Sequence, residues 1–250
     1  MLEALLIAIA VFVGALSQRA VGFGIPLFLV PVLLIYFQPP VAMIIFLLVA
    51  TASNLLVLFA HKEKKEIIWP IIIRLFIAAL PGLIGGAFIV TRIDKSVLQI
   101  IVGGLVILSI CIQEFVFPKP TSRLGVSRGI AWSGLAAGLL NSTVGVSAPA
   151  LVLWFRTHIC TTNQLRHNLA AIFLLMNVVS FISVCISKPA ALSSKPLIIF
   201  VISLPVALLG NFAGQFIAQR INKRQFEKII LVVVIATGFM SAALGLINLH

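Results

Sequence analysis

The chain has 250 residues, of which 61% are hydrophobic and 10% are charged, with a mean hydropathy of +1.21. This composition excludes an ordinary soluble domain, which cannot cover so much apolar surface. The net charge is +12, but there is no basic tail and no interleaving of basic and aromatic residues, so nothing indicates nucleic-acid binding. Because the basic residues lie between apolar runs, we expect an all-α integral membrane protein.

Six apolar runs are long enough to cross a bilayer, since a helical crossing needs about 20 residues. Four other runs are shorter, and the first of them would extend only about 21 Å into a hydrocarbon core about 30 Å thick. We therefore expect eight to ten transmembrane or re-entrant helices. The long runs are residues 41–60, 67–90, 97–117, 166–187, 196–219 and 228–247, and the short runs are residues 4–17, 21–36, 128–140 and 144–156.

The sequence contains the same pattern twice, at an offset of 123 residues. Residues 21–26 read VGFGIP and residues 144–149 read VGVSAP, and at the same offset Asn54 corresponds to Asn177. In membrane proteins, apolar segments that glycine or proline interrupts at matching places in two halves are the best sequence indication of a transport site. We therefore expect two related membrane repeats around such a site.

The repeat boundaries follow from the polar stretch in the middle of the chain. We predict a first membrane repeat at residues 1–117, a linker at 118–127 and a second repeat at 128–250. In one threading, each pair of short runs forms two passes or a re-entrant hairpin, and the repeats are inverted. In the other, each pair is one broken helix that crosses once, and the repeats are parallel.

The positive-inside rule separates the two threadings. The inverted one places 14 basic residues on one face and four on the other, whereas the parallel one gives 9 against 8. We therefore favour inverted repeats in the cell membrane with both termini outside, and a cysteine at Leu249 labelled only from the cytoplasm would contradict this. Ten spans and six spans with two hairpins both satisfy the rule. The four residues on the outer face are Arg92, Lys95, Lys188 and Lys195.

Residues 17–24 and 140–147 are polar, glycine-bearing segments between short apolar runs. Irregular backbone at membrane depth persists only where it is buried in protein or lines a wet cavity. Such breaks expose helix N-termini, whose N–H groups and positive dipole ends suit an anion. The alternative is two ordinary loops near the surface. The candidate ligand-binding residues in these segments are Gln18, Gly22, Gly24, Asn141, Ser142, Thr143, Gly145 and Ser147.

Three further residues are candidates because polar groups are costly inside a membrane. Arg19 is the only charged residue between Glu3 and Lys62. An anionic substrate would compensate its charge at the midplane, although a topological charge on a short cytoplasmic loop is equally consistent. Asn54 and Asn177 lie inside apolar runs, where an amide needs hydrogen-bond partners. Either a substrate or a neighbouring helix provides such a partner.

The titratable residues do not indicate catalysis. None of the six acidic residues is central in an apolar run, so a proton relay through membrane carboxylates is not indicated. The four histidines are scattered, and the sequence has no HExxH motif, no Cys/His ligand set and no nucleophile–base signature. We expect neither an enzyme nor a bound metal or other cofactor.

The ordered set of motifs resembles the sulfite exporter TauE/SafE family of membrane permeases. The resemblance rests on GFG at 22–24 before Pro26, on QPPVA at 38–42 and on GVSAPALV at 145–152. Many members carry a longer run of glycines where this chain reads NST at 141–143. The resemblance implies transport of small anions such as sulfite, sulfoacetate and other organosulfur or carboxylate compounds.

We therefore predict a secondary transporter for a small anion, with its site between the two breaks and one repeat rocking against the other. Export is favoured because an anion that leaves a negative interior gains about 2.3 kcal/mol per charge per 100 mV. An anion channel, a membrane-embedded enzyme and a scaffold subunit of a larger complex are the alternatives. A homodimer is compatible with the sequence.

Overall fold

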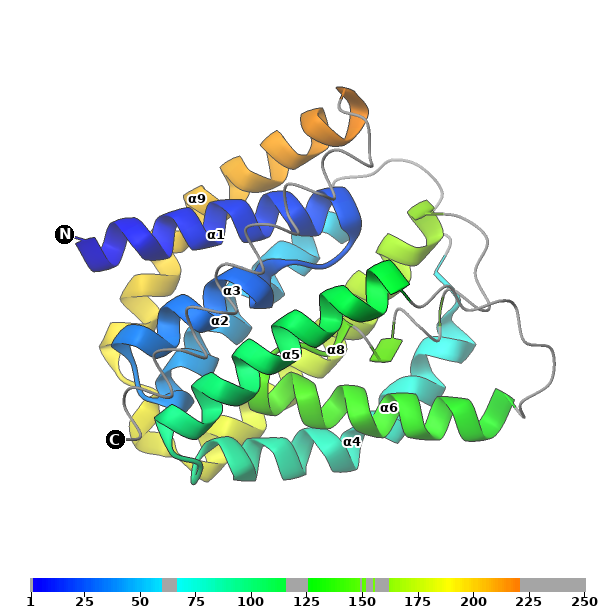
Figure 1. Cartoon of the computed structure of the whole chain (residues 1–250), viewed down its shortest axis with the longest axis horizontal. Coiled ribbons are helices and arrows are strands. Elements are labelled where there is room, and N and C mark those ends of the chain that lie inside the picture. Colours follow the sequence, from blue (N-terminus) through cyan, green and yellow to red (C-terminus); the bar gives the residue numbers. More distant parts are fainter. Residues whose placement is uncertain are drawn as a thin grey trace.

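The computed structural model describes residues 2–59, 67–115, 126–148, 150–151, 155 and 162–220 of the chain. In this part the regular elements are helices, without strands, as the composition predicts. The apolar run 228–247 and most of the predicted linker lie outside the described residues. In chain order the elements are α1 Leu2–Val21, α2 Ile25–Tyr36, α3 Pro39–Phe59, α4 Trp69–Val90, α5 Lys95–Phe115, α6 Val126–Val144, α8 Thr162–Ser187, the 3₁₀-helix η1 Pro189–Ala191 and α9 Ser194–Arg220 (Figure 1).

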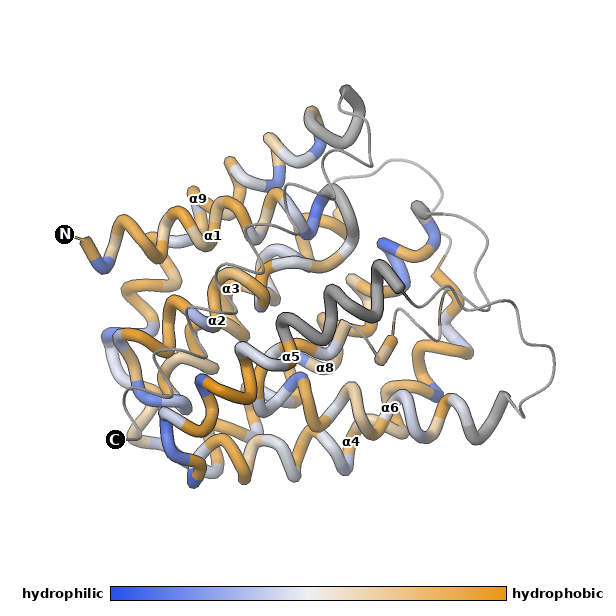
Figure 2. Tube along the Cα trace, viewed as in Figure 1, coloured by the Kyte–Doolittle hydropathy of each residue, from blue (hydrophilic) through white to orange (hydrophobic). Residues whose placement is uncertain are grey.

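The helices follow the apolar runs. α3, α4, α5, α8 and α9 coincide, to within a few residues, with five of the six long runs, which confirms those predictions. Five of the described helices, α1, α3, α4, α8 and α9, are long and apolar enough to cross a membrane. Hydrophobic residues cover the helix bodies and hydrophilic ones gather toward the ends (Figure 2). This distribution is that of a multi-pass membrane protein.

The first helix is longer than predicted. α1 has 20 residues and is about 30 Å long, so the prediction that this run falls short of a bilayer is wrong. Ser17, Gln18 and Arg19 continue the helix instead of breaking it. Their helix propensities are only a few tenths of a kcal/mol below that of alanine, and the protein interior surrounds their side chains. α6 likewise continues through its polar residues to Val144.

The two predicted breaks therefore shrink to residues 22–24 and 145–147. Each begins with a glycine of positive φ, which is 102° at Gly22 and 74° at Gly145. A side chain is strained in this conformation, and a glycine that adopts it commonly ends a helix. The ends of α1 and α6 are thus built alike, 123 residues apart.

After the first break the chain turns back on itself. α2 packs against α1, and a Cβ on Gly14 would lie 2.9 Å from the Cα of Ile25. α1 and α2 therefore form a helical hairpin (Figure 1), as the first threading requires, and not one broken helix. α2 has 12 residues and extends about 18 Å, which is less than the thickness of a hydrocarbon core.

Glycines bring α4 and α6 into close contact. A Cβ on Gly82 would collide with the carbonyl oxygen of Leu135, and a Cβ on Gly86 would lie 2.6 Å from that of Leu139. Residue numbers increase together along the two helices, so α4 and α6 run in the same direction. Gly85 differs from its neighbours, because a Cβ there would meet no described atom within 4 Å.

α1 and α9 make the corresponding contact. A Cβ on Gly210 would lie 2.5 Å from the carbonyl oxygen of Phe12, and one on Gly214 would lie 2.6 Å from that of Leu16. These two helices also run in the same direction. Small residues let helices approach closely in lipid, so at these positions the glycines have a packing role.

Polar contacts group the helix ends at two opposite ends of the bundle. At one end, the backbone N–H of Ile68 donates to Asn168 Oδ1 at 2.9 Å, and Gly22 packs against Arg166. At the other end, Lys95 Nζ donates to the carbonyl oxygen of Ile35 at 2.9 Å. The C-terminus of α1 therefore lies with the N-termini of α4 and α8, and the C-terminus of α2 lies with the N-terminus of α5.

Candidate functional site

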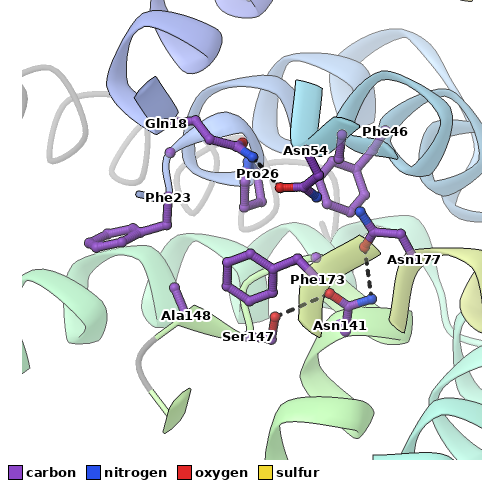
Figure 3. Close-up of a pocket in the computed structure, with 13 residues that line it drawn as sticks. Gln18, Phe23, Pro26, Phe46, Asn54, Asn141, Ser147, Ala148, Phe173 and Asn177 are labelled. Carbon is purple, nitrogen blue, oxygen red and sulfur yellow. Dashed lines mark hydrogen bonds between the residues drawn. The ribbon is translucent and has the colours of Figure 1, made fainter. Parts of the chain in front are cut away.

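A small cavity lies where the two breaks meet α3 and α8 (Figure 3). We call it the amide cavity because four side-chain amides line it. Its volume is about 20 Å³, which is room for one or two water molecules. As far as the structure describes the lining, it contains no charged side chain. The lining residues are Gln18, Phe23, Gly24, Pro26, Phe46, Ala50, Asn54, Asn141, Gly145, Ser147, Ala148, Phe173 and Asn177.

Two pairs of amides form the polar walls. Gln18 Nε2 donates to Asn54 Oδ1, and Asn141 Nδ2 donates to Asn177 Oδ1 at 3.1 Å. All four side chains are buried. The two pairs are related by the offset of 123 residues, so the duplicated sequence pattern recurs as a duplicated contact (Figure 3).

Each pair leaves a donor toward the cavity. Asn54 and Asn177 use their carbonyl oxygens within the pairs, and neither Nδ2 has a hydrogen-bond partner among the described residues. A primary amide nitrogen carries two N–H groups. In Figure 3 these two nitrogens are on the sides of the asparagines that face each other. The cavity therefore presents hydrogen-bond donors from both halves of the chain, which suits an acceptor-rich ligand.

Asn141 is held from several directions. Its Nδ2 also donates to Ser180 Oγ at 3.1 Å, and its Oδ1 accepts a hydrogen bond from Ser147 Oγ at 3.1 Å. Ser180 and Ser142 share a hydrogen bond of 2.7 Å between their hydroxyls. These contacts consume both N–H groups of Asn141, so its role is to orient Asn177.

Seven of the eleven predicted ligand-binding residues line the cavity. They are Gln18, Gly24, Asn54, Asn141, Gly145, Ser147 and Asn177.

The other four are buried near the cavity but do not line it. Gly22 packs on Arg166, and Ser142 contacts Ser180. Thr143 Oγ1 donates to the carbonyl oxygen of Leu139 at 2.6 Å within its own helix. Gly22 and Ser142 therefore face α8, whereas the Thr143 hydroxyl bonds to its own helix.

Arg19 is the fourth residue outside the lining. It is 7% exposed, and its Nη2 donates to Gln215 Oε1 on α9 at 3.3 Å. A Cβ on Gly22 would lie 3.2 Å from the Arg166 side chain, so two basic residues, Arg19 and Arg166, lie near the first break. They contribute positive potential to that end of the bundle without contacting the cavity.

Sequence reasoning missed the apolar wall and Ser180. Phe46 and Ala50 are eight and four residues before Asn54, and Phe173 is four residues before Asn177. This spacing puts them on the same helix faces as the asparagines, so it could have identified them. Whether these side chains form one wall depends on the tertiary arrangement, because α3 and α8 are distant in sequence.

Phe46 also packs on the second break, because a Cβ on Gly145 would lie 2.7 Å from its ring. Among the described residues no group of three His, Cys, Asp or Glu side chains could hold a metal ion. The polar side chains that line the cavity are neutral amides and a serine hydroxyl, which form hydrogen bonds.

A bundle of membrane-crossing helices around a buried polar cavity, next to paired helix breaks, defines a membrane transporter. Residues 6–241 match the family described as Sulfite exporter TauE/SafE. The chain therefore belongs to the TauE/SafE family of membrane permeases, which confirms the resemblance seen in its motifs. Searches of curated proteins and of solved structures gave no significant match.

Proposed function

We propose that the chain is a secondary transporter for a small anion, built from two inverted repeats, and that the anion binds in the amide cavity between Asn54 and Asn177. The observation that carries the proposal is that the Nδ2 groups of Asn54 and Asn177 both face the cavity. Neutral N–H donors without a nearby carboxylate stabilise an anion and release it again, because they bind it without forming an ion pair. Hydrogen bonds to charged groups contribute about 1.5–3 kcal/mol each, which suits reversible transport.

The helix directions support inverted repeats. The offset relates α1 to α6 and α4 to α9, and α4 runs parallel to α6 while α1 runs parallel to α9. In Figure 1, α1 runs away from the N-terminus at the left and α4 runs back toward that side. α6 therefore runs opposite to α1, as expected for equivalent helices of inverted repeats. Such repeats allow alternating access by rocking around a shared site.

The size of the cavity supports a carrier over a permanently open channel. A volume of about 20 Å³ admits one or two waters, so a polyatomic anion requires the surrounding helices to separate. The family name indicates sulfur oxyanions as the substrate class. Export is the favoured direction, because a negative interior repels an anion by about 2.3 kcal/mol per charge per 100 mV.

Purified protein in liposomes loaded with radiolabelled sulfite, thiosulfate, sulfoacetate or a small carboxylate tests the proposal. We expect saturable efflux of at least one of these anions, accelerated by an inside-negative potential. Unlabelled anion on the opposite side should stimulate exchange, which a carrier supports. Flux that stays proportional to concentration would support a channel, and no flux of any anion would contradict a transport function.

A further inference from the structure

We infer that Ser180 is a positioning residue of the amide cavity, and that it makes the second half of the site the rigid half, which holds the anionic group of the substrate. The inference rests on the proposed function. Ser180 is fully buried on α8, does not line the cavity, and lies three residues beyond Asn177 on the same helix. Its action on a ligand is therefore indirect.

The hydroxyl of Ser180 determines which way Asn141 points. It accepts one N–H of Asn141 at 3.1 Å, while Asn177 Oδ1 accepts the other at 3.1 Å. Ser147 donates to the Oδ1 of the same amide. Rotating this amide by 180° would place its oxygen against Asn177 Oδ1 and would require the hydroxyls of Ser180 and Ser147 to exchange donor and acceptor roles, so the network favours the observed orientation. Asn177 must then turn its Nδ2 toward the cavity.

The first half of the chain lacks this support. At the offset of 123 residues, Ser180 corresponds to Val57, Ser147 to Gly24 and Ser142 to Arg19. None of these three offers a hydroxyl. Gln18, the counterpart of Asn141, has one hydrogen bond from its amide, to Asn54, and one more rotatable bond.

The two halves consequently differ in stiffness while sharing the same amide chemistry. Buried, fully bonded polar networks hold their side chains in one geometry, and preorganised donors bind an anion without paying conformational entropy at that moment. The Gln18–Asn54 half can change rotamers to meet ligands of different shape. We therefore assign the anionic group to Asn177 and the variable end of the substrate to Gln18 and Asn54.

Kinetics of Ser180→Ala in liposomes test the positioning role. With sulfite as the probe, we expect KM to rise about five- to tenfold and the maximal rate to stay within twofold, since the change loosens binding and not the helix movement. Ser180→Thr keeps the hydroxyl and should restore KM to within twofold of wild type. Val57→Ala, the matched substitution in the first half, should leave KM within twofold.

An unchanged KM in folded Ser180→Ala, or an equal rise in Val57→Ala, would overturn the inference. If Ser180→Ala does not fold, Ser142→Ala keeps the Ser180–Asn141 bond and weakens only its support. We then expect a two- to threefold rise in KM, and no rise would be contrary evidence. Absence of saturable flux of sulfite, thiosulfate, sulfoacetate and the small carboxylate in the wild type would instead contradict the proposed function itself.

A pair of probes that differ at one end tests the assigned orientation. Methanesulfonate and sulfoacetate share a sulfonate, and only sulfoacetate carries a second polar group. Ser180→Ala should weaken competition by both probes by the same factor, because both place the sulfonate in the rigid half. Gln18→Ala should change the ratio of their inhibition constants at least threefold. The reverse pattern would show that the substrate lies the other way round.

Discussion

At the scale of single residues, the protein satisfies buried polar groups by hydrogen-bonding one side-chain amide to another. An unpaired amide in an apolar environment costs several kcal/mol, and each pair removes part of that cost while leaving one nitrogen for a ligand. Asn54 and Asn177 each contact a neighbouring helix and each line the cavity, so the proposed function gives them both of the roles that sequence reasoning treated as alternatives.

Replacing the amide of Asn177 by a carboxylate tests whether the site requires a hydrogen-bond donor at this residue. We predict that Asn177→Asp raises KM for sulfite at least 10- to 100-fold, because it removes a charge-assisted hydrogen bond and adds a like charge. The measurement is saturable flux in liposomes. Gln215→Glu adds the same charge outside the cavity, beside Arg19, and should change KM less than threefold. Similar effects of the two substitutions would mean that net charge, not the donor, matters.

Arg19 has a different expected role, because its side chain bonds to Gln215 and not to the cavity. We predict that Arg19→Gln raises KM for sulfite less than tenfold in the liposome assay, because the side chain acts on the anion only through its charge at a distance. A rise of 100-fold or more would instead indicate direct contact with the anion.

At the scale of elements, two glycine-lined contacts, α4 with α6 and α1 with α9, hold helices from different halves together. Carbonyl oxygens of one helix lie where a Cβ of the other would be. These contacts therefore join the two halves, and any rocking movement of one half against the other must either break the contacts or preserve them.

Adjacent glycines on one helix provide a matched test of this packing. We predict that Gly86→Ala lowers the melting temperature in detergent by about 3–10 °C, since overpacking costs about 1–3 kcal/mol. Gly85→Ala adds the same methyl where no described atom lies within 4 Å, and alanine favours helix. It should leave the melting temperature unchanged or raise it by a few degrees. Equal destabilisation by the two would contradict a close α4–α6 contact.

Sequence could predict most of the described helices and seven of the thirteen residues that line the amide cavity, because apolar length and a duplicated motif are local signals. It could not predict where α1 ends. Gln18 and Arg19 look like a loop beside apolar neighbours, and only the surrounding helices make a helical conformation favourable there. The sequence also could not identify Ser180 as a partner of Asn141, because a serine within an apolar run gives no local indication of the residues that it contacts.

At the scale of the whole molecule, the contacts between helix ends and the positive-inside rule together predict which end of the bundle faces which side of the membrane. At one end of the bundle, Lys95 at the start of α5 contacts Ile35 near the end of α2. At the other end, Gly22, just after α1, packs against Arg166 near the start of α8. From the positive-inside rule we predict that the end with Arg166 is cytoplasmic. We then expect the connection from α8 to α9 at the outer end.

Cysteine labelling in cells checks this topology. In a variant without its native cysteines, we predict that Ser193→Cys, exposed before the start of α9, reacts with a membrane-impermeant maleimide added outside intact cells. The same cysteine should not react with maleimide added to inverted vesicles, because it then faces the lumen. The opposite labelling pattern would reverse the assigned orientation.

A crystal structure grown with selenite, the selenium analogue of sulfite, and recorded at the selenium absorption edge would test directly whether an anion binds in the amide cavity. We predict an anomalous peak in this cavity, within hydrogen-bond distance of the Nδ2 atoms of Asn54 and Asn177, and loss of the peak in Asn177→Asp. A peak bound elsewhere, or one that persists unchanged in the variant, would contradict it.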